Sequence, residues 1–488
     1  MTQLSVVILA GGDGTRMNSK YPKVLQKLGN KAMIKHVLDS VLSLKAKEII
    51  VVHGHLGDQV QAALSDYKIT WVEQKERLGT GHAVMQALPY LKSDHQVLIL
   101  YGDVPLITAE TLRHLVDTTG KGQLGLLTAM VDNPVGLGRI VRDEYHQVSR
   151  IVEEKDATDL EKQISEINTG IYCLNAAYLK QWLPKLKNNN KQKEYYLTDI
   201  VALAKQNHVN INVSEPRSVR EILGANSRLE LAKLESAYQQ WQVENLMKSG
   251  VTVSDPARLD IRGKVSAKRD CHVDINVIFE GEVTLGEDCY IGPNVILKDV
   301  SLGDGVEILA HSIIENTIVH QEVVIGPFAR IRPESIIQAG ARIGNFVEIK
   351  KSLIGEGSKI NHLSYIGDTE LGERVNIGAG TITCNYDGAK KHKTIIENDV
   401  FVGSNSSLIA PVTLGNGATI GAGSVITKDA PAGALSLSRV KQETVKNWSR
   451  PKNRSENSEE TKAKTKAKTK AKAKTKAKTK AKAKESMV

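Results

Sequence analysis

The chain has 488 residues, of which 41% are hydrophobic, and a formal net charge of +10 at pH 7. This length predicts two or three domains with a sizeable core. No apolar run approaches the roughly 20 residues of a membrane-spanning helix, and no basic and apolar leader precedes the first strand, so we expect no secretory signal. Four widely separated cysteines without a C-x-x-C pair argue against a zinc or redox site and fit a reducing cytoplasm.

The net excess of positive charge lies in the C-terminal tail. Residues 461–488 contain 12 lysines and one glutamate. Subtracting this +11 from the whole-chain +10 leaves −1 for residues 1–460. The basic balance therefore does not predict that the globular part binds nucleic acid.

Strand-like and helix-like segments alternate over the first 225 or so residues. This alternation predicts βαβ units on a parallel sheet covered on both faces, with ligands beyond the carboxyl ends of the strands. The predicted strands are 6–10, 48–54, 69–74 and 96–106, and the clearest predicted helices are 32–44 and 82–91.

The loop GGDGTR, residues 11–16, follows the first predicted strand. Glycines let the backbone approach a ligand, and consecutive N–H groups can cradle a phosphate. The loop matches neither the G-x-G-x-x-G fingerprint nor the P-loop. From the loop alone, a phosphate cradle and a plain tight turn remain equally open.

A long helix is predicted from Asn226 to Gly250, since Ser227 and Glu230 fit a capping box. Aliphatic residues then recur every six positions, often followed by glycine. A period of six cannot stay on one face of a helix, but it is typical of a hexapeptide β-helix. Two uninterrupted series have six members each: Val319, Ile325, Ile331, Ile337, Ile343 and Ile349, and then Ile396, Val402, Leu408, Leu414, Ile420 and Ile426.

The repeat breaks at residues 381–394, TITCNYDGAKKHKT, which predicts a protruding functional loop. After about Ser455 the low-complexity sequence predicts a disordered tail. A solvated extension is the favoured interpretation of this tail. The alternative is salt-sensitive binding to nucleic acid or an anionic surface.

Arg332 and Lys350 are 18 residues apart, or three hexapeptides. If three hexapeptides form one coil, these cations stack about 4.8 Å apart and repel unless an anion separates them. A sugar phosphate would meet this need, although two splayed surface cations remain an alternative. His362 is expected one coil later, near Tyr365, where an imidazole could act as a general base.

Several segments together resemble one family, from residue 4 to about 450. In the first half they are LAGGDGTRM, YPKVL, EQKERLGTGHAV, LYGDVPL, GRI, EINTGIY and EYYLTDI. In the second half they are IGPFARIRP, GNFVEIKKS, HLSYIGD, VNIGAGTITCNYDG and FVGSNSSLIAPVTLG. With these segments in this order, the chain resembles the bifunctional N-acetylglucosamine-1-phosphate uridyltransferase/glucosamine-1-phosphate acetyltransferase family.

The resemblance implies a Rossmann-like α/β nucleotidyltransferase domain (1–226), a linker helix (227–250), a left-handed parallel β-helix acetyltransferase domain (251–454) and the tail (455–488). It implies acetylation of glucosamine 1-phosphate by acetyl-CoA. UMP transfer from UTP to N-acetylglucosamine 1-phosphate then gives UDP-N-acetylglucosamine and pyrophosphate, for peptidoglycan and lipopolysaccharide precursors. It also implies a cytoplasmic homotrimer whose acetyl site is shared between subunits. Left-handedness is taken from the resemblance, because crossovers are usually right-handed.

The resemblance assigns the first-domain site to the ends of the predicted strands. Arg16 and Lys23 are the catalytic cations, the Gly14 backbone joins the cradle, and Asp103 with Asn226 holds Mg²⁺, which prefers oxygen ligands. The nucleotide and sugar residues are Leu9, Ala10, Gly11, Gly12, Lys23, Gln74, Gly79, Thr80, Tyr101, Gly102, Asp103, Gly138, Glu153, Asn168 and Asn226. Individually, the cations and Asp103 could be ordinary surface or turn residues. Asp13 departs from the family pattern, and we expect its side chain to point away from the phosphates.

In the second domain the resemblance makes His362 the general base that activates the amine of glucosamine 1-phosphate for attack on acetyl-CoA. Glucosamine 1-phosphate is assigned to Arg332, Lys350, Tyr365 and Asn376. Asn385 and Tyr386 are assigned to the sugar site and to acetyl-CoA, which is also assigned Ala379, Ser404, Ala422 and Arg439. The main alternative is a single-activity sugar-1-phosphate nucleotidyltransferase with a scaffold β-helix, and a non-enzymatic repeat scaffold is a further one.

Overall fold

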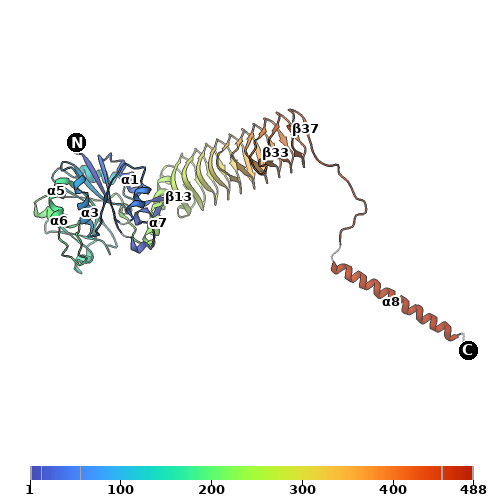
Figure 1. The fold of residues 1–488 in the computed structure, drawn as a ribbon, viewed down its shortest axis with the longest axis horizontal. Helices are drawn as coiled ribbons and strands as arrows, with labels where there is room; N and C mark the ends of the chain where they lie inside the picture. Colours follow the sequence, from blue (N-terminus) through green and yellow to red (C-terminus); the bar gives the residue numbers. More distant parts are fainter. Residues whose placement is uncertain (1–2, 13, 55, 452–453, 486–488) are drawn as a thin grey trace. The chain divides into compact units, whose positions relative to one another are not determined.

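The computed structural model describes residues 3–12, 14–54, 56–451 and 454–485. The chain divides into two compact units, Met1–Ser438 and Arg439–Val488. The first unit contains an α/β domain and a stack of short strands (Figure 1). None of the described helices is long and apolar enough to cross a lipid bilayer.

The α/β domain is built on a sheet with the strand order β11-β7-β10-β6-β1-β4-β5, to which β8 and β9 attach through β10. β1 pairs in parallel with β4 and β6, whereas β10 runs antiparallel to both β6 and β7. The predicted parallel sheet is therefore mixed. Its strands are β1 (Leu4–Ala10), β4 (Glu48–His53), β5 (Thr70–Glu73), β6 (Gln96–Tyr101), β7 (Leu124–Met130), β8 (Arg139–Arg142), β9 (Val148–Val152), β10 (Glu166–Asn175) and β11 (Ile211–Ser214).

Both faces of this sheet are buried, which explains the unbroken apolar run of β1. Val6 and Ile8 pack toward one set of helices, and Val7 and Leu9 pack toward the other. On the first side lie α1 (Met33–Leu42), α2 (Gly57–Ala63) and α4 (Ala109–Thr118). On the second side lie α3 (Thr80–Ala87), α5 (Ala176–Trp182) and α6 (Asp199–Gln206).

Helix α7 (Arg228–Lys248) joins this domain to the β-helix. The Ser227 side chain accepts a hydrogen bond from the Glu230 N–H, while Glu230 accepts from the Asn226 N–H rather than from Ser227. Only half of the predicted capping box therefore forms. Tyr238 packs on the hairpin of β2 (Lys27–Leu28) and β3 (Lys31–Ala32) at Gly29, where a β-carbon would lie 2.3 Å from the ring.

The β-helix has three strand-bearing faces, and its predicted aliphatic core is buried. Face A comprises β12 (Thr252–Val253), β14 (His272–Val273), β16 (Tyr290–Ile291), β18 (Glu307–Ile308), β20 (Val324–Ile325), β23 (Arg342–Asn345), β26 (Lys359–His362), β29 (Asn376–Ile377), β32 (Phe401–Val402), β35 (Thr419–Ile420) and β37 (Leu435–Ser436). All these strands pair in parallel with their neighbours, coil upon coil.

Faces B and C begin as long strands that pair in parallel, with one register shift between β15 and β17: β13 (Leu259–Ala267), β15 (Val277–Leu285), β17 (Ile296–Leu302) and β19 (Ile313–Val319). The two halves of β19 pair with different strands, β21 and β22, and so divide the sheet into two faces. Face B continues as β21 (Arg330–Ile331), β24 (Glu348–Lys350), β27 (Tyr365–Gly367), β30 (Ile382–Cys384), β33 (Ser407–Ile409) and β36 (Val425–Ile426). Face C continues as β22 (Ser335–Ile337), β25 (Leu353–Ile354), β28 (Thr369–Leu371), β31 (Thr394–Ile396) and β34 (Val412–Leu414). The left-handedness of the coil stays a prediction.

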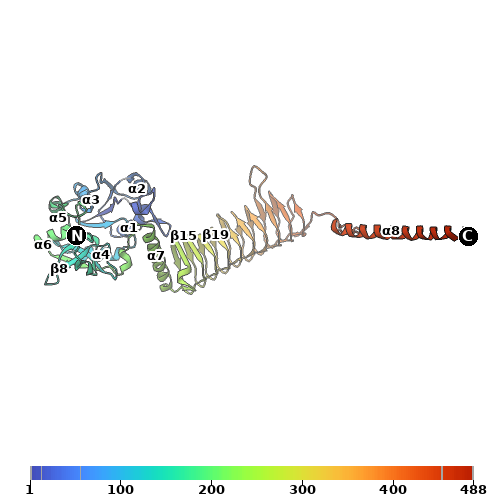
Figure 2. The same cartoon turned by 90° about the horizontal axis from the view of Figure 1, so that it is seen from below.

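The corners of the coil contain residues in the left-handed backbone region, which let the chain turn sharply. At the corner between faces A and B these residues recur every 17 or 18 positions, except for one step of 25 that spans the predicted insertion. They are Asn276, Asn294, His311, Phe328, Phe346, Leu363, Gly380, Asn405 and Gly423. The insertion protrudes from the stack of coils, as predicted (Figure 2).

The second unit contains helix α8 (Arg454–Glu485). The sequence predicted disorder here, so the structure differs. Alanine and lysine favour helices, and the Thr469 hydroxyl donates to the Thr465 carbonyl one turn earlier at 2.7 Å.

Candidate functional sites

The loop after β1 needs its glycines because the backbone is crowded there. A β-carbon on Gly11 would lie 3.2 Å from Gln74 Oε1 and 3.3 Å from the Gly54 nitrogen. Gly14 has φ +56°, and its β-carbon would lie 2.9 Å from Lys23 Cβ. Leu9 and Ala10 end the strand in the core, and Arg16 is exposed. The predicted orientation of Asp13 lies outside the described residues.

Three predicted residues from distant parts of the chain meet at Lys23. Its Nζ donates to Asn226 Oδ1 at 2.8 Å and forms an ion pair with the Asp103 carboxylate. Asp103 follows β6, close to Gly102 at the carboxyl end of that strand, and Asn226 precedes α7. A β-carbon on Gly12 would lie 3.7 Å from Lys23 Nζ. One cation thus bridges the strand ends and the glycine loop.

The Asp103 and Asn226 oxygens suit a hard divalent cation, because both already converge on one ammonium group. Among the residues that the structure describes, no group of three or more His, Cys, Asp or Glu side chains could hold a metal. The protein would therefore supply two oxygen ligands and leave the others to phosphates and water, as is usual for Mg²⁺.

Gln74, Gly79 and Thr80 form the next part of the site. Gln74 Nε2 donates to the Gly79 carbonyl at 3.1 Å, and Thr80 Oγ1 accepts from the Leu197 N–H at 3.1 Å. Gly79 fits because a β-carbon would lie 2.7 Å from the Tyr195 carbonyl oxygen. The segment containing Tyr195 and Leu197 thus supports this wall, a role to which sequence reasoning assigned no residue.

Glu153 lies with the remaining predicted sugar residues. A β-carbon on Gly138 would lie 3.5 Å from Glu153 Oε2 and 3.7 Å from Asn168 Cβ. Burial raises the pKa of Glu153, and the Thr198 hydroxyl donates to it at 3.2 Å. Burial also raises the pKa of Tyr101, with smaller contributions from the Glu153 and Asp103 charges. Tyr101 therefore connects the sugar residues to the Lys23 cluster.

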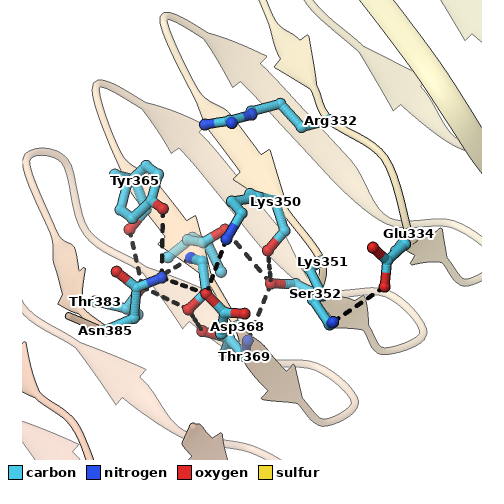
Figure 3. Close-up of polar contacts among 12 residues, drawn as sticks. Arg332, Glu334, Lys350, Lys351, Ser352, Tyr365, Asp368, Thr369, Thr383 and Asn385 are labelled. Carbon is cyan, nitrogen blue, oxygen red and sulfur yellow. Dashed lines mark hydrogen bonds and ion pairs between the residues drawn. The ribbon is translucent and has the colours of Figure 1, made fainter. Parts of the chain in front are cut away.

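Arg332 and Lys350 lie on successive coils of face B, as the 18-residue spacing predicted (Figure 3). The Arg332 N–H donates to the Ile349 carbonyl at 2.8 Å. Each cation also has a carboxylate partner: Arg332 Nη1 lies 2.9 Å from Glu348 Oε1, and Lys350 Nζ lies 3.2 Å from Asp368 Oδ2. The chain itself thus relieves part of the predicted repulsion.

The insertion adds further groups to this cluster. Asn385 Nδ2 donates to Asp368 and lies 3.4 Å from the Tyr365 hydroxyl (Figure 3). The Lys350 ammonium is the main cause of a lowered pKa at Lys391, to which Arg332 contributes weakly. We name Arg332, Lys350 and Lys391 the face B cation cluster.

His362 does not lie one coil beyond Lys350 as predicted, because Lys350 pairs with Gly367. His362 pairs instead with Asn345 on face A, and its Nδ1 lies 3.0 Å from Asn345 Oδ1. The error arises because His362 follows Lys350 by only twelve residues, less than a full coil.

The predicted acetyl-CoA residues continue the His362 column along face A. From the pairing of β26, β29, β32 and β35, His362 is followed on successive coils by Ala379, Ser404 and Ala422. The Asn405 N–H donates to the Ala379 carbonyl at 2.7 Å and the Gly423 N–H to the Ser404 carbonyl at 2.8 Å, which keeps this register.

Asn376 is not part of the face B cation cluster. It lies on face A between Lys359 and Phe401 in the pairing register. Tyr386 is 60% exposed on the insertion, where its hydroxyl donates to the Gly388 carbonyl at 2.6 Å. Arg439 begins the second unit.

Comparison with known proteins agrees with this division of the chain. Residues 6–161 match the MobA-like NTP transferase domain. Residues 282–314 match the hexapeptide repeat of succinyl-transferase, residues 313–386 the GMPPB C-terminal domain, and residues 393–428 the bacterial transferase hexapeptide.

Curated relatives match along almost their whole length. The bifunctional protein GlmU of Marinobacter nauticus is 53% identical over 452 residues, which cover 93% of this chain and 100% of the relative. That of Francisella tularensis subsp. novicida is 55% identical over 452 residues, covering 93% and 99%. The chain belongs to the GlmU family.

Within this GlmU family chain, sequence reasoning missed Glu348, Asp368 and Lys391. Asp368 lies 18 residues after Lys350, so the spacing that pairs Arg332 with Lys350 could have found it. Glu348 precedes Lys350 by two positions on one strand, whose side chains at such positions share a face. Lys391 offered no signal beyond the lysine-rich composition of the insertion.

Proposed function

We propose that this chain is a bifunctional transferase with one active site in each half. The β-helix acetylates glucosamine 1-phosphate with acetyl-CoA. The α/β domain then transfers UMP from UTP to the N-acetylglucosamine 1-phosphate, releasing pyrophosphate. The face B cation cluster carries this conclusion, since a scaffold β-helix needs no such cluster beside a protruding loop.

In the α/β domain, the Gly11, Gly12 and Gly14 backbone would cradle the triphosphate, with Arg16 and Lys23 neutralising the charge that develops on it. The sugar phosphate oxygen attacks the α-phosphorus in line, and pyrophosphate leaves. Gln74 and Thr80 would contact uridine, and Glu153 and Asn168 the sugar. Mg²⁺, when bound at Asp103 and Asn226, would supply further neutralisation of the phosphates.

In the β-helix, the face B cation cluster would bind the sugar phosphate, with Tyr365 and Asn385 beside it. An amine must lose a proton as it attacks the thioester. The Nδ1–H of His362 donating to Asn345 Oδ1 would leave a lone pair on Nε2, which could accept that proton. His362 is exposed, so a substrate can reach it.

The acetyl site is completed by a second copy of the chain in a homotrimer. Two observations support this proposal. The His362 column lies on face A, whereas Arg332 and Lys350 lie on face B. Phe328 and Phe346 form an exposed stack at the corner between these faces, with ring centroids 5.4 Å apart, and exposed aromatic rings of this kind suit a subunit interface.

Mixing two inactive variants tests the shared site. We expect His362→Ala and Lys350→Ala each to lose acetyl transfer, and co-refolded mixtures to regain part of it through hybrid sites. Light scattering of the wild type should give the mass of a trimer. A monomeric mass, or mixtures that stay inactive although trimers form, would contradict the shared site.

Two assays test the activities directly. We expect release of a free thiol from acetyl-CoA with glucosamine 1-phosphate, and release of pyrophosphate from UTP with N-acetylglucosamine 1-phosphate. Pyrophosphate release without thiol release would support the nucleotidyltransferase with a scaffold β-helix. If neither thiol nor pyrophosphate were released, the enzymatic proposal as a whole would be contradicted.

A further inference from the structure

We infer that helix α8 binds double-stranded nucleic acid through its phosphates, without sequence preference. Lysine occupies every second position from Lys462 to Lys484. With a rise of 1.5 Å per residue, the helix carries one positive charge per about 3 Å of its axis. B-DNA carries one negative charge per about 1.7 Å. Two such charge densities favour association through counterion release.

The acidic residues of α8 are confined to its ends, at Glu456, Glu459, Glu460 and Glu485. Residues 461–484 contain no Asp or Glu, whereas cations of the β-helix form ion pairs such as that of Arg374 with Asp399. All side chains from Thr461 to Lys480 are exposed. This charge is therefore available to an external polyanion.

The arrangement of the lysines favours a nucleic acid over a membrane. Alternate positions on a helix step by about 200°, which distributes the lysines around the whole circumference. The intervening residues are all Ala or Thr, so α8 has no face of large apolar side chains to insert among lipids. A charged cylinder about 10–12 Å across fits the DNA major groove, which is about 12 Å wide.

Fluorescence anisotropy with a labelled 30-base-pair duplex tests this inference on the full chain. If about half of the lysines contact phosphates, we expect the logarithm of the affinity to fall with the logarithm of the salt concentration, with a slope of about −5. Deleting residues 461–488 should abolish binding, as should replacing all twelve lysines with Gln. Replacing them with Arg should preserve it, and a duplex of unrelated sequence should bind equally.

Three outcomes would overturn the inference. One is duplex binding that survives the deletion. Another is a clear preference for one duplex sequence. The third is binding to vesicles containing anionic lipid at a salt concentration where the duplex no longer binds, which would make a membrane surface the partner instead.

A separate observation concerns Lys23, and this second inference rests on the proposed function of its site. We propose that Lys23 occupies the cation position until a divalent metal displaces it. Its ammonium contacts the same Asp103 and Asn226 oxygens that would hold the metal. The Lys23 and Asp103 side chains are only 12% and 14% exposed, so solvent screens this pair weakly.

The ammonium and a divalent cation cannot share these two oxygens, because like charges at such distances repel. Metal binding must therefore release the Lys23 Nζ. Gly12 is close enough to the Nζ for the released amine to meet a phosphate bound at the loop. The metal would thus prepare the lysine for the nucleotide, and without nucleotide the lysine would weaken metal binding.

Binding of Mn²⁺ alone, followed by the electron paramagnetic resonance signal of the free ion, tests this displacement. We expect Lys23→Met to bind Mn²⁺ several-fold more tightly than the wild type, although it removes a residue of the active site. Lys20→Met, at a nearby exposed lysine, should leave the affinity unchanged, and Asp103→Asn should lose binding. Equal affinity of Lys23→Met and the wild type would refute the displacement alone. Absence of binding to both would contradict the metal site as well.

Discussion

At the scale of single residues, the two candidate sites use the same arrangement. Lys23 is held by Asp103 and Asn226, and Lys350 is paired with Asp368, to which Asn385 donates. In each site, one carboxylate and one carboxamide side chain lie close to a lysine side chain. An arriving phosphate must compete with that carboxylate, and the two partners keep the lysine in place until then.

Lys391 is expected to react unusually fast with amine-directed reagents. Lys350 lowers the pKa of Lys391, so a larger fraction is neutral at pH 8 than of an ordinary lysine. We expect mass spectrometry after brief acylation to show faster labelling of Lys391 than of Lys359, and protection by glucosamine 1-phosphate. Lys350→Ala should slow the labelling. Unchanged labelling in that variant would show that Lys350 does not perturb Lys391.

Several of the predicted site residues lie close together in the structure, whereas their charge partners were not predicted. Lys23, Asp103 and Asn226 meet as the resemblance implied, and Arg332 stacks on Lys350 as the spacing implied. Their charge partners Glu348 and Asp368 were missed, although strand alternation and the 18-residue spacing could have indicated them. The assignment of Asn376 to the glucosamine 1-phosphate site stays a prediction.

At the scale of elements, the period of six predicted the β-helix core but not its corners. The steps of 17, 18 and 25 residues between left-handed corner residues show that coils absorb deletions and insertions there. Core positions stay in register because each aliphatic side chain must fill the narrow interior. In the α/β domain, the antiparallel direction of β10 could not be predicted from its composition, because a buried parallel strand would have the same composition.

The core of β19 offers a matched test of this packing. Ile314 is fully buried and Ile318, in the same strand, is 50% exposed. We expect Ile314→Ala to lower the free energy of unfolding by about 2–5 kcal/mol and Ile318→Ala by no more than about 0.5 kcal/mol. Urea unfolding followed by circular dichroism measures both. Equal losses would contradict the assigned inward and outward faces.

The helicity of α8 is expected to depend on the salt concentration. Lysines four residues apart, such as Lys462 and Lys466, repel each other on a helix, and salt screens that repulsion. The far-ultraviolet circular dichroism of a peptide spanning residues 454–488 should therefore show helicity that increases from 0.02 to about 0.5 M salt. Helicity that decreases over this range would contradict the balance between propensity and repulsion.

At the scale of the whole molecule, α7 connects the two catalytic halves. Tyr238 packs on the α/β domain at Gly29, while Gln239 exchanges two hydrogen bonds with the Ile261 backbone, at 2.9 and 2.7 Å, on the first coils of the β-helix. The acetylated sugar phosphate made by one half is the substrate of the other. The two sites use separate residues, so each reaction should be removable alone.

The most direct measurement follows both reactions in one mixture of acetyl-CoA, glucosamine 1-phosphate and UTP. Lys23→Ala should release free thiol at the wild-type rate and form no UDP-N-acetylglucosamine. His362→Ala should release no thiol, yet form that product when N-acetylglucosamine 1-phosphate is added. Loss of both reactions in either well-folded variant, or normal UTP turnover in Lys23→Ala, would contradict two independent sites in one chain.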